Sequence, residues 1–166
     1  VEKNYLDIIS AKTASLFGAS MRVGGCINNR SKKEKEALES FGRNLGTCFQ
    51  ITDDILDYSA KEKVFGKKIG NDFLEGKITL PIILLFQKSN KIERQTLNKF
   101  FSQNIRNQDD FNKTLGLIKK YKIIETCKKR ADYFSNVAAD SLSIFEKNFT
   151  IEKLQELSFY IVNRLN

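Results

Sequence analysis

The chain has no histidine and only one proline, Pro81, among its 166 residues. Without histidine, metal sites and acid–base catalysis that depend on an imidazole are excluded. A single proline, together with apolar residues repeated at intervals of three and four, predicts an all-helical protein. No apolar run approaches the ~18 residues that a membrane helix requires, so we expect no membrane span.

Cysteine is also scarce. Cys26, Cys48 and Cys127 are odd in number and lack the spacing of a metal site. Cys48 shares a helix face with Phe41 and Leu45, which suits burial. We therefore expect core thiols in a reducing compartment and a cytoplasmic protein. At 41% apolar residues, a chain of this length is one ordinary domain that can bury a core.

The chain is basic, with 28 Lys and Arg against 20 Asp and Glu and a net charge of +8. Such a balance allows contact with nucleic acid or with an anionic membrane. The basic residues are spread along the chain, however, with no dense cluster interleaved with aromatics. We therefore expect no nucleic-acid partner.

Capping residues and apolar periodicity predict the helices. Ser31 and Glu34 form a capping-box pattern that starts a long helix ending near Tyr58, and Pro81 suits a first helical position. We expect one long loop over residues 61–79, an N-cap at Thr150 for a last helix, and a buried stripe running from Ile124 to Phe145. The other expected helices cover residues 4–21, closed by glycines 24 and 25, and residues 82–87, 93–101 and 109–121.

The acidic run Asp53-Asp54-Ile55-Leu56-Asp57 is the most informative local pattern. On a helix, residues three and four apart share a face, so Asp53 and Asp57 point the same way with Asp54 beside them. Clustered carboxylates repel one another unless a cation lies between them, and hard oxygen ligands suit Mg²⁺. The residues alone leave two readings open, a magnesium site and an ordinary solvated acidic surface.

The surroundings of this run favour the magnesium site. Phe49 and Gln50 precede it at helical spacing, and a segment rich in glycine with Lys67 and Lys77 follows it. Acids, cations and glycine-rich backbone together are typical of a site for a diphosphate and its magnesium ions.

Three motifs in this order resemble those of the trans-isoprenyl (polyprenyl) diphosphate synthases. The run from Gly46 to Tyr58 is similar to the second aspartate-rich motif of that family. The later runs, Gly66-Lys67 to Asp72 and Glu75 to Pro81, are similar to the segment that follows it. Lys12-Thr13-Ala14 resembles the family's lysine–threonine motif, and the forms of these motifs are closest to those of the long-chain octaprenyl diphosphate synthase group.

The resemblance implies an all-α, isoprenoid-synthase-type helical bundle that transfers prenyl groups head to tail. Isopentenyl diphosphate is added to an allylic diphosphate, with Mg²⁺ assisting the departure of the leaving diphosphate. The implied metal ligands are Asp53, Asp54 and Asp57. The implied roles of the other residues are diphosphate contact for Lys12, Lys67 and Lys77, stabilisation of the allylic cation for Thr13 and Gln50, and lining of the chain pocket for Phe49.

Lys12 also stands out from the residues alone. Apolar residues, among them Tyr5, Ile8 and Leu16, fall on its side of the predicted helix, and a charge among apolar neighbours is rarely left unpaired. A lysine that snorkels at the edge of the stripe is the alternative. Asp72 and Glu75 fit equally well as supporting partners of the site or as loop surface.

One family feature, a first aspartate-rich motif far upstream of Lys12, has no counterpart in this chain. We therefore expect residues 1–166 to be the C-terminal half of a polyprenyl synthase domain, inactive alone, that forms a homo-oligomer or pairs with a missing N-terminal half. The alternative is a non-catalytic partner subunit of a heteromeric prenyl synthase. The intact acidic triplet argues against that alternative, because a regulatory subunit does not need it.

Overall fold

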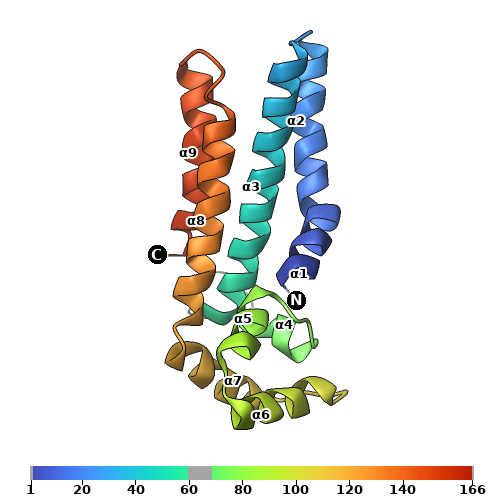
Figure 1. The fold of residues 1–166 in the computed structure, drawn as a ribbon, viewed down its shortest axis with the longest axis vertical. Coiled ribbons are helices and arrows are strands. Elements are labelled where there is room, and N and C mark those ends of the chain that lie inside the picture. The colour runs from blue at the N-terminus through green and yellow to red at the C-terminus, as the bar shows by residue number, and fades with distance from the viewer. Residues whose placement is uncertain (1, 60–68, 166) are drawn as a thin grey trace. The chain divides into compact units, whose positions relative to one another are not determined.

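The computed structural model describes residues 2–59 and 69–165, and every regular element in this part of the chain is a helix (Figure 1). The prediction of an all-α protein is therefore confirmed. In chain order the elements are α1 (Glu2–Ile9), a π-helical turn (Ser10–Ala14), α2 (Ser15–Ile27), α3 (Lys32–Ser59), α4 (Asn71–Leu74), α5 (Leu80–Lys88), α6 (Lys91–Ser102), α7 (Gln108–Lys120), α8 (Ile123–Ser141) and α9 (Phe149–Asn163). None of these described helices is long and apolar enough to cross a membrane.

The chain divides into two compact units. We call residues 3–52 with 128–164 the bundle unit, and residues 53–127 the motif unit. Helix α3 starts in the bundle unit, and its end, from Asp53 onward, belongs to the motif unit.

Glycines bring α2 and α3 close together in the bundle unit. A Cβ atom on Gly42 would overlap the backbone of Phe17 and Gly18. A Cβ atom on Gly46 would lie 2.8 Å from the Cα atom of Ala14, closer than real Cβ contacts come. The two glycines thus allow this close approach of the backbones, although each glycine costs about 1 kcal/mol of helix stability.

Helices α8 and α9 complete the bundle unit, where Figure 1 shows them running alongside each other. The Ser40 and Ser141 hydroxyls lie 2.8 Å apart and link α3 to α8. The Gln155 side-chain amide donates to the Ala139 carbonyl over 3.1 Å and links α9 to α8.

The first predicted helix differs from the structure in two ways. The π-helical turn interrupts it at residues 10–14, and α2 continues through Gly24 and Gly25 to Ile27. Gly25 is buried and faces Leu38, whose Cδ1 atom would lie 2.9 Å from a Cβ at this position. Packing against α3 therefore explains this glycine, which the sequence suggested as a helix end.

The capping predictions for α3 and α5 are confirmed. The Ser31 N–H donates to the Glu34 carboxylate over 2.8 Å, and the Glu34 N–H donates to the Ser31 hydroxyl over 3.3 Å. Hydrogen bonds from the Ser31 hydroxyl and N–H to the Glu34 carboxylate lower the pKa of Glu34. Pro81 lies in the first turn of α5, as predicted.

The predictions for α8 and α9 are partly wrong. Asn148, and not Thr150, caps α9, because its side-chain oxygen accepts the Ile151 N–H over 3.0 Å. Helix α8 ends at Ser141, so Phe145 lies beyond it. In α9, Leu157 is 43% exposed, whereas Ile161 is buried.

Two of the three cysteines are core thiols. Cys48 and Cys127 are buried, and burial raises the pKa of Cys48 to about 12. Cys26 is exposed, so the prediction of a core thiol is wrong at that position. It lies in the last turn of α2, beyond the point where the sequence predicted the helix to end.

In the motif unit, α6 and α7 form a helical hairpin. The Glu93 carboxylate at the start of α6 accepts bonds from Lys120 Nζ over 2.7 Å and from the Tyr121 hydroxyl over 2.6 Å. Phe73 of α4 packs its ring against those of Phe100, Phe101 and Phe111. Aromatic packing therefore joins α4 to the hairpin.

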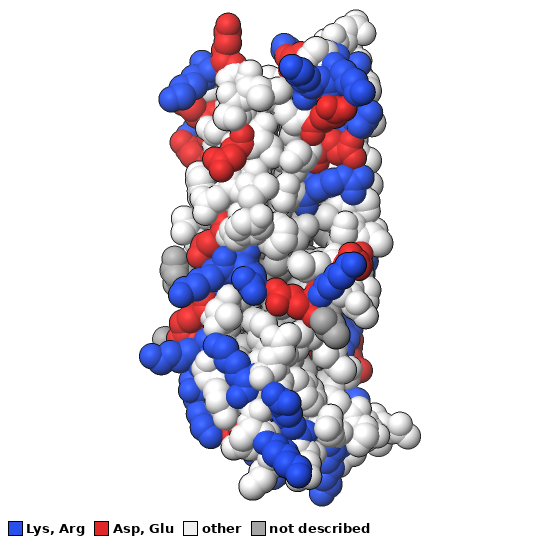
Figure 2. All heavy atoms as spheres, viewed as in Figure 1, with Lys and Arg blue, Asp and Glu red and all other residues white. Residues whose placement is uncertain are grey.

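Charge is unevenly distributed over the motif unit. On the face drawn in Figure 2, blue Lys and Arg side chains gather over the part that contains α6 and α7 in Figure 1. These two helices carry six exposed basic residues, Lys91, Arg94, Lys99, Lys113, Lys119 and Lys120.

Candidate functional site

The three candidate metal ligands lie on one continuous helix, as predicted. Helix α3 extends to Ser59 and carries Asp53, Asp54 and Asp57. Asp54 is 5% exposed, and the other two are half-buried. The helical spacing that the sequence argument required is therefore present in the motif unit.

The carboxylate of Asp57 binds the start of α4. Its Oδ1 atom accepts the Asn71 N–H over 3.2 Å, and its Oδ2 atom accepts the Asp72 N–H over 3.0 Å. The Gly70 N–H donates to the Asp57 carbonyl over 3.0 Å. A negative side chain is favourable at the positive end of a helix. Asp57 therefore ties the end of α3 to the start of α4.

The environment of Asp57 acts on its pKa in both directions. Burial raises the pKa of this carboxyl, and the nearby charge of Asp72 adds to the rise. The N–H donors of Asp72, Asn71 and Gly70 lower the pKa, but by less in total, so the net direction is upward.

Gly70 is required by both its backbone and its surroundings. Its φ angle is +86°, which favours glycine, and a Cβ atom there would overlap the ring of Phe111. The single long loop predicted over residues 61–79 is wrong in its second part, because α4 occupies Asn71–Leu74.

Lys77 forms a small ion cluster with two acids of its own segment. Its Nζ atom lies 2.7 Å from the Glu75 carboxylate and 3.1 Å from that of Asp72. The hydrogen bonds to Glu75 and Asp72 raise the pKa of Lys77, so it stays a cation. Asp72 thus contacts the Asp57 carboxylate through its N–H and Lys77 through its side chain, a role that the sequence left open. Lys67, the other predicted cation, lies outside the described residues.

The donor set fits magnesium. Within residues 2–59 and 69–165, no three Cys, Asp or Glu side chains converge into a metal cage. Magnesium does not need one, because it binds through one or two carboxylates, waters and substrate phosphates. Each carboxylate oxygen offers about two acceptor sites. The two amide bonds of Asp57 therefore leave acceptor sites on its own carboxylate for a hard cation.

Thr13 and Gln50 meet in the bundle unit. The Thr13 hydroxyl donates to the Gln50 side-chain oxygen over 3.0 Å, joining the π-helical turn to α3. Single π-helical turns inside α-helices are frequent at functional sites. The structure thus brings together two residues that the sequence assigned to one task.

The apolar surroundings predicted for Lys12 are buried only in part, because Tyr5 is buried but the other named neighbours are not. Lys12 is exposed, and its apolar neighbours Ile8 and Leu16 are 63% and 71% exposed. The π-helical turn between Ile9 and Ser15 shifts the helical register, so a stripe drawn at α-helical spacing does not follow the buried face.

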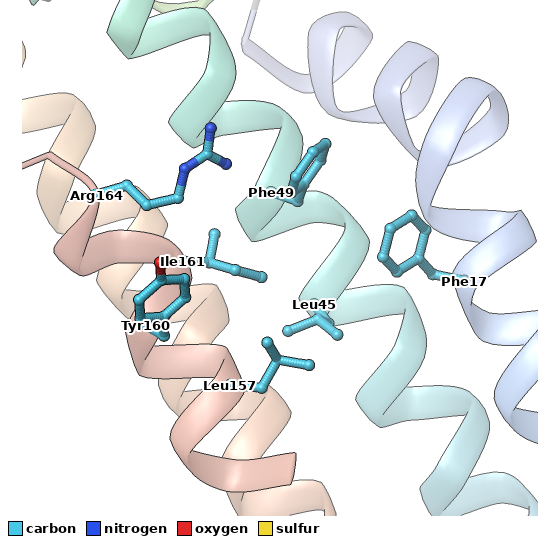
Figure 3. A pocket seen from close by; sticks show the side chains of 7 residues that line it. All are labelled: Phe17, Leu45, Phe49, Leu157, Tyr160, Ile161 and Arg164. Carbon is cyan, nitrogen blue, oxygen red and sulfur yellow. The ribbon is translucent and has the colours of Figure 1, made fainter. Parts of the chain in front are cut away.

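Phe49 lines an apolar cavity within the bundle unit. Its volume is about 390 Å³, and Figure 3 shows side chains of α2, α3 and α9 facing it. The Arg164 guanidinium lies 5.6 Å from the centre of the Phe49 ring, and the Phe17 ring lies 6.0 Å away on α2. Neither Phe17 nor Arg164 is among the site residues that the sequence predicts. The lining residues are Phe17, Leu45, Phe49, Leu157, Tyr160, Ile161 and Arg164.

Comparison with known proteins gives a consistent result. The family model described as polyprenyl synthetase matches residues 1–118. The chain is 29% identical to octaprenyl diphosphate synthase of Haemophilus influenzae, over 98% of this chain and 49% of that protein. It is 35% identical to geranylgeranyl diphosphate synthase of Sulfolobus acidocaldarius, over 86% of this chain and 43% of that protein.

Solved structures agree with the sequence relatives. A polyprenyl synthase from Caulobacter crescentus, complexed with calcium and isoprenyl diphosphate, is similar with a TM-score of 0.94 at 33% identity. That match covers 100% of this chain and 51% of the other. A decaprenyl diphosphate synthase from Rhodobacter capsulatus is similar with a TM-score of 0.88 at 30% identity, over 100% and 50% of the two chains. The chain spans about half the length of the curated relatives named above.

Proposed function

This chain belongs to the polyprenyl synthetase family, and we propose that it carries the diphosphate-binding half of a prenyl transfer site. At such a site isopentenyl diphosphate is added to an allylic diphosphate. The observation that carries the proposal is the pair of bonds from the Asn71 and Asp72 N–H groups to Asp57. Through them, the segment with Asp72 and Lys77 is held against the acidic end of α3.

The reaction requires charge to be stabilised where it develops. The bond between the allylic carbon and the diphosphate oxygen breaks, and the electron pair leaves with the diphosphate. The double bond of isopentenyl diphosphate then forms a new bond to the allylic carbon, and a proton is lost. Fixed charges and dipoles aimed at the separating charges lower this barrier.

We assign the residues of the motif unit to the leaving diphosphate. Asp53 and Asp54 would hold Mg²⁺, with Asp57 as a further oxygen donor that also fixes the α4 segment. Magnesium supplies charge neutralisation for the departing diphosphate when it is bound there. Lys77 would offer its cation to the diphosphate oxygens, and the resemblance assigns Lys67 the same task.

We assign the residues of the bundle unit to the hydrocarbon part of the allylic substrate. The Thr13–Gln50 hydrogen bond fixes the dipoles of both side chains, and these would face the allylic cation. Phe49 would contact the prenyl chain, for which the apolar cavity beside it offers a suitable surface. Lys12, which is exposed on the same π-helical turn as Thr13, would contact diphosphate oxygens.

Ligand-dependent thermal stability tests this assignment. A ligand that binds only the folded state raises its stability, by about 2.7 kcal/mol at 100 times Kd. We expect farnesyl diphosphate, an allylic diphosphate, to raise the Tm only when Mg²⁺ is also present. Farnesol, which lacks the diphosphate, should have little effect. An equal rise with farnesol, or no rise with farnesyl diphosphate and Mg²⁺, would contradict the proposal.

A further inference from the structure

Arg106 lies in the connection between α6 and α7, and no motif of the sequence includes it. Its guanidinium donates from Nη1 to the Leu74 carbonyl over 3.3 Å and from Nη2 to the Phe101 carbonyl over 3.4 Å. The guanidinium carbon also lies 5.6 Å from the centre of the Phe101 ring. One side chain thus joins the end of α4 to the end of α6.

The turn after α4 is shaped around this guanidinium. Gly76 has a φ angle of +77°, and a Cβ atom at this position would overlap the Arg106 guanidinium. The turn is closed by hydrogen bonds from the Gly76 N–H to the Phe73 carbonyl over 3.0 Å and from the Lys77 N–H to the Asp72 carbonyl over 2.8 Å. Gly76 therefore meets two requirements, the left-handed backbone and the space for Arg106.

Burial shows that Arg106 belongs to the interior of this turn. Its Nε atom is buried and has no hydrogen-bond partner among the described residues. A buried donor without a partner costs free energy. The two hydrogen bonds to carbonyls and the contact with the Phe101 ring offset this cost.

This turn also fixes the position of Lys77. Its backbone N–H is fixed by Asp72, and its Nζ atom lies within ion-pair distance of Asp72 and Glu75. A displacement of the Leu74 carbonyl or of Gly76 would therefore move Lys77 relative to the acidic end of α3.

We infer that Arg106 is a positioning residue that holds the Leu74–Gly76 turn and thereby sets Lys77 for contact with a diphosphate. This inference rests on the proposed function. We assign Arg106 to the turn rather than to the ligand, because its guanidinium donates to the Leu74 and Phe101 carbonyls. Lysine cannot replace it, since an ammonium group lacks the planar fork that reaches both carbonyls.

Titration with inorganic diphosphate in the presence of Mg²⁺ tests the inference in Arg106→Lys and Arg106→Gln. We expect the Kd to rise about tenfold in both, the equivalent of about 1.4 kcal/mol, because a displaced Lys77 loses a charge-assisted bond to the ligand. Arg94→Lys is the matched control. Arg94 also donates to a backbone carbonyl, that of Gln87, over 2.9 Å, but it lies away from the turn. It should bind like the wild type.

A double-mutant cycle with Lys77→Ala separates positioning from general damage to the fold. If Arg106 acts through Lys77, then Arg106→Lys should cost no further affinity in the Lys77→Ala background. An equal loss in both backgrounds, or an unchanged Kd in Arg106→Lys and Arg106→Gln, would overturn the inference. A wild-type chain that binds no diphosphate with Mg²⁺ would instead remove the proposed function, and this inference with it.

Discussion

The Asn71 and Asp72 amides bond to Asp57 and not to Asp53. Both oxygens of Asp57 accept backbone N–H groups of α4, so this residue supports the local structure of the site besides serving as a candidate metal ligand. Loss of a carboxylate that caps a helix N-terminus costs about 1 kcal/mol. The two aspartates should therefore respond differently to substitution.

We expect Asp57→Ala to destabilise the protein by about 1 kcal/mol and to speed hydrogen exchange at the Asn71 and Asp72 amides. Asp53→Asn is the control and should leave exchange at these amides unchanged. Hydrogen-exchange rates measured by NMR test the effect on the two amides, and urea denaturation measures the change in stability. Unchanged protection of both amides in Asp57→Ala would show that the bonds to Asp57 do not hold α4.

The spacing of residues in the sequence predicts the acidic part of the site but not the contacts that hold it in place. Asp53, Asp54 and Asp57 share a helix, which the local pattern is sufficient to predict. The amides that bind Asp57 lie at residues 71 and 72, and Arg106 reaches Gly76 from another helical connection. Such pairings depend on tertiary packing, which no local pattern encodes.

The contact between α2 and α3 gives a prediction at the scale of the helix. Gly42 faces the Phe17 backbone, whereas nothing lies within 4 Å of a Cβ atom on Gly24. We expect Gly42→Ala to destabilise the protein by about 1–3 kcal/mol, because the added methyl overpacks the contact. Gly24→Ala should stabilise it by about 0.5–1 kcal/mol, because alanine is the better helix former.

Chemical denaturation of the two glycine variants measures both changes. They form a matched pair, since each adds one methyl group to a glycine within a helix. Shifts of the same sign in both variants would argue against a close approach of α2 and α3.

The α6–α7 hairpin gives a prediction about pH. Bonds from Lys120, Tyr121 and the Asn90 N–H lower the pKa of Glu93 from 4.5 to about 2. A depressed pKa in the folded state stabilises the protein above the ordinary pKa, and this contribution is lost as the pH falls through the folded value. The relevant window therefore lies between about pH 4.5 and pH 2.

We expect the Tm of the wild type to fall more steeply through this window than that of Glu93→Gln. At neutral pH, Glu93→Gln should have the lower Tm. Glu146→Gln is the control, because Glu146 is exposed and has no side-chain bond within residues 2–59 and 69–165. Parallel Tm curves for the wild type and Glu93→Gln would contradict the assigned role of Glu93.

Helix boundaries show which signals are local. The capping box of Ser31 and Glu34 and the position of Pro81 are local, and both predictions are confirmed. The extension of α2 to Ile27 packs Gly25 against Leu38 of α3, a tertiary contact that periodicity does not encode. Periodicity does not indicate the π-helical turn either. The cap of α9 was placed two residues late, because Asn148 and Thr150 are both suitable caps by composition.

For the whole molecule, exposed apolar side chains on α2 predict association. Leu16, Val23 and Ile27 are 71%, 55% and 75% exposed and recur at helical spacing. Apolar patches above a few hundred Å² are rare in soluble monomers, and burial contributes roughly 25 cal/mol per Å². We therefore expect self-association, or pairing with a separate chain.

Sedimentation velocity of the wild type and of Leu16→Gln tests this expectation. The substitution should weaken association. Ile105→Gln, at a residue that is 84% exposed in the motif unit, should not. A clean monomer at high concentration, with no co-purified partner, would count against association through α2.

The central claim is that the acidic end of α3 binds a diphosphate together with magnesium. Calorimetric titration of the wild-type chain with inorganic diphosphate tests it most directly, with and without Mg²⁺. We predict binding that requires Mg²⁺ and is abolished in the Asp53→Asn, Asp54→Asn, Asp57→Asn triple variant. Asp109→Asn, which removes a carboxylate from the first turn of α7, should retain it. Equal binding by the wild type and the triple variant would contradict the claim.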